Sequence, residues 1–289
     1  MSFKLLTDSA ANLPEEMIEK YDIGILSLSF LVDGEEFYSY IKGETTDLAQ
    51  FYGMMRDKKD IRTSLVNLED AMKACDAVLK EGQDVLYMGF SSGLSGTYQA
   101  VSLALENLKE EYPERKILYV DTLAAALGEG LMVKYAVDLR EDGRSIEEVY
   151  QWVLDNRLKL VHWFTVEDLF FLKRGGRVSG ATAVLGTALS IKPVMHVDDE
   201  GHLIVMEKAR GRKKSLDALI KHMEETAVDP EKQTVFISHG DCLEDAVYVA
   251  DKIKETLHVK DVMIRILDPV IGAHSGPGTV ALFFMGNKR

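Results

Sequence analysis

Val85-Leu86-Tyr87-Met88-Gly89-Phe90 is an apolar run that leads directly into the sequence Ser91-Ser92-Gly93-Leu94-Ser95-Gly96-Thr97. A short apolar run that ends in serine and glycine is typical of a buried strand followed by a loop. Beyond the loop, apolar residues recur at helical spacing, at Ala100, Val101, Ala104, Leu105 and Leu108. This order of strand, loop and helix predicts one unit of a parallel sheet with crossover helices.

The same alternation continues through the rest of the first half. Strands are predicted at residues 3–7, 23–30 and 117–120. Four polar residues precede helical patterns, as N-cap residues do: Asn12, Asp47, Asn67 and Ser145. Ser145 also forms a predicted capping box with Glu148. We therefore expect residues 1–156 to form an N-terminal α/β domain with a mainly parallel sheet.

The second half has a different pattern. Residues 193–197 and 203–206 flank the turn 198–201 and predict an antiparallel hairpin. Further strands are predicted at 234–237, 263–267 and 279–284, and helices near 183–189, 216–223 and 246–257. We expect residues 157–289 to form a C-terminal α/β domain with a mixed sheet, with the boundary near Asn156. The fold class is thus α/β, with two domains.

Composition limits the range of functions. The formal net charge of -13 disfavours nucleic acid and anionic membrane as partners. The two cysteines, Cys75 and Cys242, lie far apart and favour core thiols in a reducing compartment. The start of the chain lacks a signal-peptide pattern, and no segment approaches the roughly 18 apolar residues of a membrane span, so we expect a cytoplasmic protein. The histidines have no metal-ligand spacing, and we expect neither a metal nor a cofactor.

The loop from Ser91 to Thr97 has the features of an anion site. Free N–H groups at a helix start attract anions, and hydroxyl groups can add hydrogen bonds. The loop also lies at the carboxyl end of a predicted parallel strand, where open α/β sheets bind ligands. Ser92, Ser95 and Gly96 are the candidate ligand-binding residues there. The alternative is a capping loop without a ligand, because helix caps are common.

Two other segments carry similar groups. Thr63 and Ser64 form a hydroxyl pair just before a predicted helix cap, and the alternative there is an ordinary loop. His274 and Ser275 stand in a glycine-rich loop that would let the backbone approach a ligand. Histidine can donate to an acidic head group, although a lone histidine is often structural or exposed.

Basic residues cluster twice on this acidic chain, around Lys173, Arg174 and Arg177 and again from Arg210 to Lys214. Such clusters can dock an acidic partner or a phosphate group. The alternative to docking is that the first cluster is an ordinary solvent-exposed turn and the second an ordinary solvent-exposed helix start.

These segments, taken together, resemble the DegV family of fatty-acid-binding proteins. The resemblance covers nearly the whole chain, and the serine-glycine loop and the basic glycine turn are its most specific parts. The matching motifs are 7–14, 32–34, 63–64, 91–97, 121–122 with 128–130, 172–177, 192–193 and 272–278.

The resemblance implies two α/β domains with a long-chain fatty acid buried between them. It implies a carrier subunit of a fatty acid kinase in phospholipid metabolism, with no catalytic activity of its own. A separate kinase subunit, related to dihydroxyacetone kinases, would phosphorylate the bound carboxyl group to an acyl phosphate. Carried over to this chain, Thr63, Ser95 and His274 would contact the carboxylate. Arg174, Arg177 and Arg210 would lie near the surface that faces the kinase.

Physical chemistry agrees with this implication. A carboxylate removed from water must be hydrogen-bonded, and two hydroxyls, a histidine and helix-start N–H groups can satisfy it without a buried counter-ion. The chain departs from the family at Leu65 and Val66, where Gln-Pro often follows the Thr-Ser pair. This change affects the rigidity of the loop and the geometry by which the tail enters.

Two alternatives use the same residues. Ser95 lies on a strand-to-helix turn, as the nucleophile of a serine hydrolase or acyl transferase does, with His274 as its base and Asp241 or Asp268 to orient the histidine. Thr97 stands where the hydrolase motif Gly-x-Ser-x-Gly has its final glycine, which disfavours this reading. The other alternative is a lipid sensor without a catalytic partner.

Overall fold

The computed structural model describes residues 3–178 and 191–289, so the helix expected near 183–189 lies outside the described residues. The first half forms a four-stranded, wholly parallel sheet in the order β2-β1-β6-β7. Its strands are β1 (Phe3–Asp8), β2 (Gly24–Leu26), β6 (Asp84–Gly89) and β7 (Ile117–Asp121). The predicted parallel sheet is therefore confirmed, and the strand at 85–90 is shifted by one residue.

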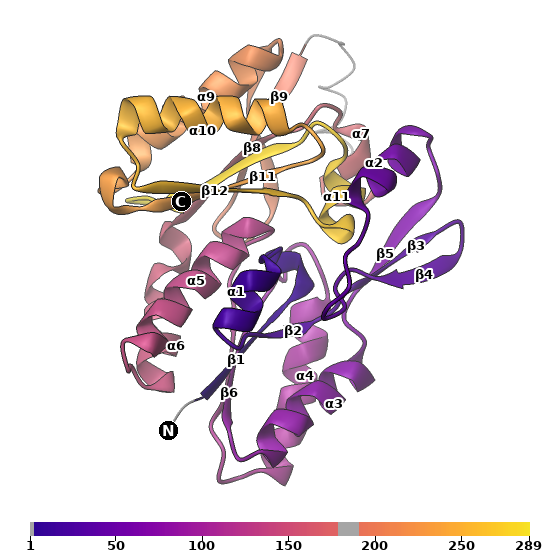
Figure 1. The fold of residues 1–289 in the computed structure, drawn as a ribbon, viewed down its shortest axis with the longest axis vertical. Helices are drawn as coiled ribbons and strands as arrows, with labels where there is room; N and C mark the ends of the chain where they lie inside the picture. Colours follow the sequence, from indigo (N-terminus) through magenta and orange to yellow (C-terminus); the bar gives the residue numbers. More distant parts are fainter. Residues whose placement is uncertain (1–2, 179–190) are drawn as a thin grey trace.

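Helices cover both faces of this parallel sheet. Figure 1 shows α3 and α4 on one side and α5 and α6 on the other. Their bounds are α3 (Leu68–Lys80), α4 (Thr97–Glu111), α5 (Leu127–Glu141) and α6 (Ile146–Asn156). Asn67 caps α3 through its side chain, and Ser145 and Glu148 form the predicted capping box of α6.

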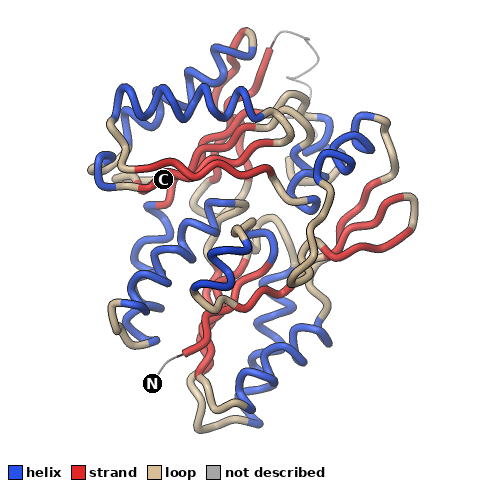
Figure 2. Tube along the Cα trace, viewed as in Figure 1, coloured by secondary structure: helices blue, strands red, loops and turns tan. Residues whose placement is uncertain are grey.

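The second half forms a six-stranded mixed sheet in the order β10-β9-β8-β13-β11-β12. Only β11 and β12 pair in parallel, and β9 with β10 is the predicted hairpin. The strands are β8 (Leu160–Thr165), β9 (Ile191–Val197), β10 (Leu203–Arg210), β11 (Thr234–His239), β12 (Asp261–Ile266) and β13 (Val280–Met285). Helices α9 (Arg212–Thr226) and α10 (Leu243–Leu257) cover the upper face, and α5 packs below (Figure 2).

This arrangement confirms the predicted fold of two α/β domains, with a parallel sheet in the first and a mixed sheet in the second. The limit near Asn156 stays a prediction; α6 ends at that residue, and β8 opens the mixed sheet at Leu160.

A small antiparallel sheet that the sequence did not predict extends from the first half (Figure 1). Its strands are β3 (Ser29–Val32), β4 (Glu35–Tyr38) and β5 (Ile61–Ser64), in the order β4-β3-β5. Helix α2 (Leu48–Arg56) lies between β4 and β5 in the sequence, and Asp47 caps it as predicted. The single strand expected at 23–30 is wrong. The Leu28 N–H donates to Ser9 Oγ at 3.0 Å, so the chain leaves the parallel sheet before β3 begins.

The first helix, α1 (Glu15–Lys20), begins after Pro14, and the prediction that Asn12 caps it is wrong. Asn12 has a φ of 54° and donates its amide Nδ2 to the Ile266 carbonyl at 3.0 Å. Proline disfavours helical geometry in the residue before it, so Leu13 cannot join the helix.

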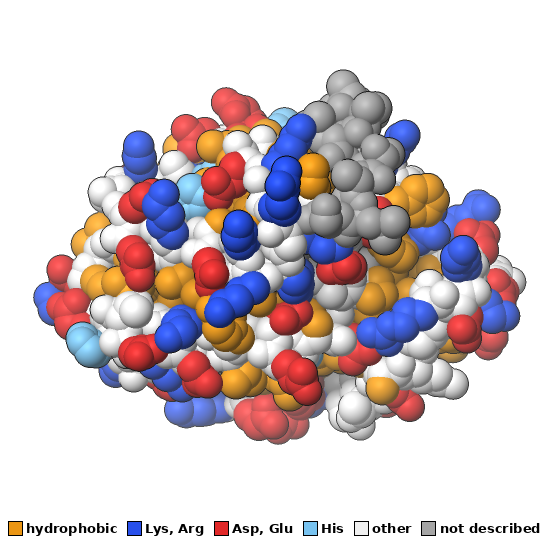
Figure 3. Space-filling model, turned by 90° about the horizontal axis from the view of Figure 1, so that it is seen from above, with side chains coloured by type: hydrophobic (Ala, Val, Ile, Leu, Met, Phe, Trp, Pro, Cys, Tyr) orange, Lys and Arg blue, Asp and Glu red, His pale blue; other side chains and the backbone are white. Residues whose placement is uncertain are grey.

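Two hydrophobic clusters stabilise this arrangement. The larger cluster spans both halves, and the smaller lies between the mixed sheet and the helices α9 and α10. Cys75 and Cys242 are free thiols, as predicted. No helix within the described ranges has the length and apolar character that a membrane crossing needs. Seen from above, acidic and basic side chains are interspersed over the visible face, as on an ordinary solvated surface (Figure 3).

Candidate functional site

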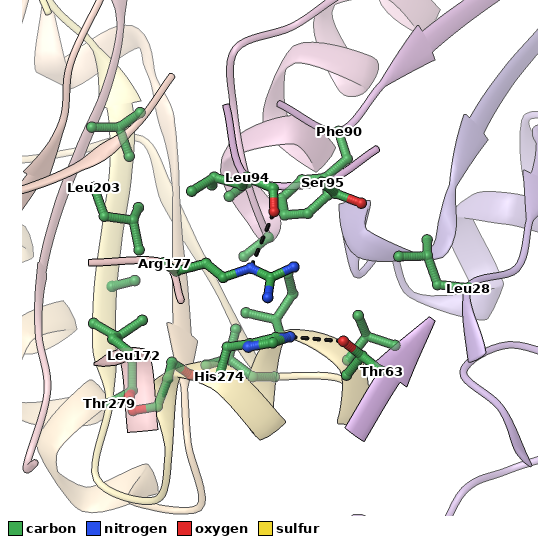
Figure 4. Close-up of a pocket in the computed structure, with 18 of the residues that line it drawn as sticks. Leu28, Thr63, Phe90, Leu94, Ser95, Leu172, Arg177, Leu203, His274 and Thr279 are labelled. Atoms are coloured by element: carbon green, nitrogen blue, oxygen red, sulfur yellow. Dashed lines mark hydrogen bonds between the residues drawn. The ribbon is translucent and has the colours of Figure 1, made fainter. Parts of the chain in front are cut away.

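A cavity of about 240 Å³ lies between the two domains. Its walls are mostly apolar, and the close-up in Figure 4 shows side chains of both domains facing it. Among the apolar lining residues are Leu28, Phe90 and Leu94 from the first domain and Phe164, Leu172, Leu203, Ala281 and Phe283 from the second. An apolar interior of this kind suits a hydrocarbon chain.

Thr63 and His274 meet in the wall of the cavity. Thr63 lies near the end of β5, and His274 lies in the short helix α11 (Pro269–Ser275). The Thr63 Oγ1 atom is 2.7 Å from His274 Nε2, which is a strong hydrogen bond (Figure 4). The described residues offer no partner to the buried Nδ1 atom of His274. A proton on Nε2 would avoid an unpaired buried N–H group at Nδ1, and we assign that tautomer.

Burial lowers the pKa of His274 to about 4, and the positive charges of Arg177 and Arg174 add to this effect. The imidazole is therefore neutral near pH 7. With its proton on Nε2, it donates to Thr63 Oγ1, and the Thr63 hydroxyl proton is then free to donate into the cavity.

The prediction of a histidine-containing loop is wrong, because His274 is helical. Asp268 caps α11: its Oδ1 accepts the N–H groups of Val270 at 2.8 Å and Ile271 at 3.3 Å. Asp241 forms an ion pair with Arg56 at 2.6 Å. Neither carboxylate has a hydrogen bond to the histidine in the described structure, so the triad that a hydrolase would need is not assembled.

Ser95 lines the same cavity and comes from the loop before α4. Its Oγ is 2.9 Å from Thr97 Oγ1 and accepts the Thr97 N–H at 3.1 Å. The loop is tied to the second domain, because Ser91 Oγ donates to the Gly201 carbonyl at 2.9 Å. A Cβ atom at Gly93 would lie 2.9 Å from the Glu200 carbonyl oxygen, so a glycine is needed for this close approach.

Six of the seven predicted ligand-binding residues line the cavity: Thr63, Ser64, Ser95, Gly96, His274 and Ser275. The seventh, Ser92, is outside the lining, and its N–H donates to the Asp121 carboxylate at 3.3 Å. Thr63, Ser95 and His274 are partly exposed, whereas Phe164, Ala281 and Phe283 are buried. These three polar residues are thus closer to solvent than the three apolar ones.

The three predicted docking arginines occupy different positions. Arg174 is exposed in α7 (Phe170–Arg174), with its guanidinium 5.3 Å from the centre of the Phe171 ring. Arg210 is exposed at the end of β10. Arg177 instead lines the cavity; its Nε donates to the Leu94 carbonyl at 3.1 Å and its Nη1 to Gly175 (Figure 4). The expectation of a site without a buried counter-ion therefore needs correction, because a half-buried guanidinium lies in its wall.

His162 is a lining residue that sequence reasoning missed. It lies in β8 and packs edge-on against Phe283, with ring centres 5.2 Å apart. Burial lowers the pKa of His162 well below its usual range, so it is neutral and serves as part of the wall. A Cβ atom at Gly128 would lie 2.3 Å from its Nε2 atom. The glycine at 128 was therefore the one available signal for this contact.

Comparisons with known proteins point to one family. A family model described as an uncharacterised protein of the DegV family matches residues 2–287. A DegV domain-containing protein of Clostridium perfringens is 46% identical over 287 residues, which are 99% of this chain and 98% of that protein. A DegV lipid binding protein from Thermotoga maritima has a similar structure, with a TM-score of 0.87, 31% identity and full coverage of both chains. A DegV family protein from Thermus thermophilus, described as binding fatty acid, has a TM-score of 0.89 at 30% identity, over 99% of this chain and 100% of that one.

Proposed function

The chain belongs to the DegV family, and we propose that it holds a long-chain fatty acid between its domains and presents the carboxylate to a separate kinase subunit. The observation that carries the proposal is that Thr63, Ser95 and His274 all line one largely apolar cavity, with Thr63 and His274 hydrogen-bonded to each other. These three residues come from segments that are distant in the sequence. Solved relatives described as lipid or fatty acid binding support the choice of ligand.

The head group is stabilised by hydrogen bonds and a nearby positive charge. A carboxylate that leaves water loses several kcal/mol unless its oxygens are hydrogen-bonded. Hydroxyl protons of Thr63 and Ser95 would each donate to one oxygen. The guanidinium of Arg177, in the same cavity wall, favours the ionised form of the acid.

The tail supplies most of the binding free energy. Each methylene group that moves from water into an apolar site contributes about 0.8 kcal/mol, so a long acyl chain gains on the order of 10 kcal/mol before ordering costs. The buried walls around Phe164, Ala281 and Phe283 provide this environment.

Presentation to a kinase is supported by the partial exposure of Thr63, Ser95 and His274. These residues would hold the carboxylate near the surface, where a kinase could phosphorylate it to an acyl phosphate. Arg174 and Arg210 are exposed cations and are our candidates for docking this kinase, which we expect to be related to dihydroxyacetone kinases. The carrier itself has no catalytic step in this scheme.

The hydrolase alternative fits the geometry less well, because the His274 imidazole bonds to Thr63 and not to Ser95. A general base must lie within hydrogen-bond reach of its nucleophile. A lipid sensor would use the same site, and it differs from the carrier in having no kinase that acts on the bound acid.

The proposal is tested by identifying the molecule that copurifies with the protein. Denaturing extraction followed by mass spectrometry should release a fatty acid in near-stoichiometric amount. Addition of a DegV-type kinase subunit with ATP should then convert the bound acid to an acyl phosphate, trapped as its hydroxamate. Absence of lipid, together with no rise in Tm when fatty acid is added, contradicts the binding role; lipid without conversion by any kinase tried favours the sensor.

A further inference from the structure

A second hydroxyl group lies directly behind Ser95. Thr97, the first residue of α4, is fully buried, and its Oγ1 is 2.9 Å from Ser95 Oγ. On its other side, the backbone N–H of Val66 points at the same Oγ1 atom at 3.4 Å. Thr97 therefore connects the segment after β5 to the serine that faces the cavity.

The proton in each hydrogen bond from Val66 through Thr97 to Ser95 can be assigned from the chemistry of the groups. The Val66 N–H can only donate, so Thr97 Oγ1 accepts from it. The Thr97 hydroxyl is buried, and its proton needs an acceptor, because an unsatisfied buried donor is costly. Within the described structure, Ser95 Oγ is the acceptor within reach of that proton.

The backbone of Thr97 strengthens the same assignment. Its N–H also donates to Ser95 Oγ, at 3.1 Å. Ser95 Oγ then accepts two hydrogen bonds, which uses both of its lone pairs. The only hydrogen-bonding capacity left to Ser95 is its own proton, and the open direction is the cavity that it lines.

We propose that Thr97 is a positioning residue that holds Ser95 as a hydrogen-bond donor and so makes the site selective for head groups that only accept hydrogen bonds. The inference rests on the proposed binding function and names its ligand class, the ionised carboxylate. Thr63, whose Oγ1 accepts the hydrogen bond from His274 Nε2, is the second donor that lines the cavity. Two donors suit two carboxylate oxygens, whereas the proton of a fatty alcohol would have no acceptor at Ser95.

The test compares ligands that share a tail and differ in the head group. Equilibrium affinities for palmitate and 1-hexadecanol are measured with the wild-type protein, Thr97→Val and Thr97→Ser. The valine keeps the shape of the threonine and removes its hydroxyl, and the serine keeps the hydroxyl. Thr165→Val is the matched control, since Thr165 is equally buried, lies outside the cavity lining, and its hydroxyl finds no partner within the described structure.

We expect wild-type protein to prefer palmitate, and Thr97→Val to lower this preference about tenfold, the value of one hydrogen bond of about 1.4 kcal/mol. Thr97→Ser should restore the wild-type preference and Thr165→Val should keep it. Should Thr97→Val not fold, Thr97→Ala removes the same hydroxyl and should lower the preference in the same direction.

An unchanged ratio of the two affinities in Thr97→Val, or in Thr97→Ala where that variant replaces it, overturns the inference; an equal loss for acid and alcohol is such a result. That outcome leaves the proposed function intact as long as wild-type protein binds palmitate. Failure of wild-type protein to bind either ligand instead contradicts the proposed function.

Discussion

The hydrogen bond between Thr63 and His274 predicts that the two residues act on the ligand as one unit. Thr63→Val removes the hydroxyl that would donate to the carboxylate. A hydrogen bond to a charged group contributes about 1.5–3 kcal/mol, so the affinity for palmitate should fall between about 10-fold and 150-fold. His274→Phe keeps an aromatic ring and removes the Nε2 proton that the 2.7 Å contact directs at Thr63. We expect it to weaken binding by about 1–2 kcal/mol.

The double variant distinguishes this coupling from two independent contacts. Once Thr63 has lost its hydroxyl, the histidine has nothing left to orient, so its replacement should cost little more. The double-mutant cycle should therefore give a coupling of about 1 kcal/mol or more. Isothermal titration with palmitate measures all four affinities, and Thr165→Val serves as the control for loss of a buried hydroxyl. If the losses of binding free energy in the two single variants add up to the loss in the double variant within about 0.5 kcal/mol, the two residues act separately, and the proposed coupling between Thr63 and His274 is refuted.

Three further predictions concern acidity, loop packing and reactivity. Burial raises the pKa of Asp8 to about 6 and that of Glu129 well above its usual range, so the folded protein binds protons that the unfolded chain has released. The stabilisation that these two protonated carboxyls give is fully present below about pH 3.8, the unfolded pKa of aspartate, and is lost as pH rises through their folded pKa values, by on the order of 1 kcal/mol per pH unit for each group. Chemical unfolding should therefore show that wild-type protein loses stability relative to Glu129→Gln as pH rises, and a stability difference that does not change with pH is incompatible with the assignment. Gly93→Val should weaken palmitate binding at least severalfold, because the side chain pushes the Ser95 loop from the Glu200 carbonyl; unaltered affinity would show that the loop has room. Ser95 should not react with an activated phosphonate probe, and labelling that is lost in Ser95→Ala would revive the hydrolase.

Local rules explain which parts of the fold could be predicted. The strand and helix around the Ser91–Thr97 loop follow from apolar spacing, and the caps at Asp47, Asn67 and Ser145 depend on contacts within a few residues. Asn12 was misassigned because its actual partner, the Ile266 carbonyl, lies in the other domain. The break after Leu26 also depends on a contact that is not local, since the Leu28 N–H donates to Ser9 Oγ in the same domain.

The candidate site could be predicted in its residue types but not in its geometry. Hydroxyl-rich and glycine-rich segments identified Thr63, Ser95 and His274, and the structure brings all three to one cavity. Nothing in the local sequence indicates that Arg177 turns inward to the Leu94 carbonyl while Arg174, three residues earlier, stays exposed. That difference arises from the packing of the two domains, which a linear pattern does not encode.

A crystal structure of the protein with bound palmitate tests the central claim most directly. The account predicts carboxylate oxygens within about 3.2 Å of Thr63 Oγ1 and Ser95 Oγ, with the tail running between Phe164 and Phe283. A palmitate that lies with its carboxylate away from both hydroxyls, or that binds outside the space between the domains, would contradict it.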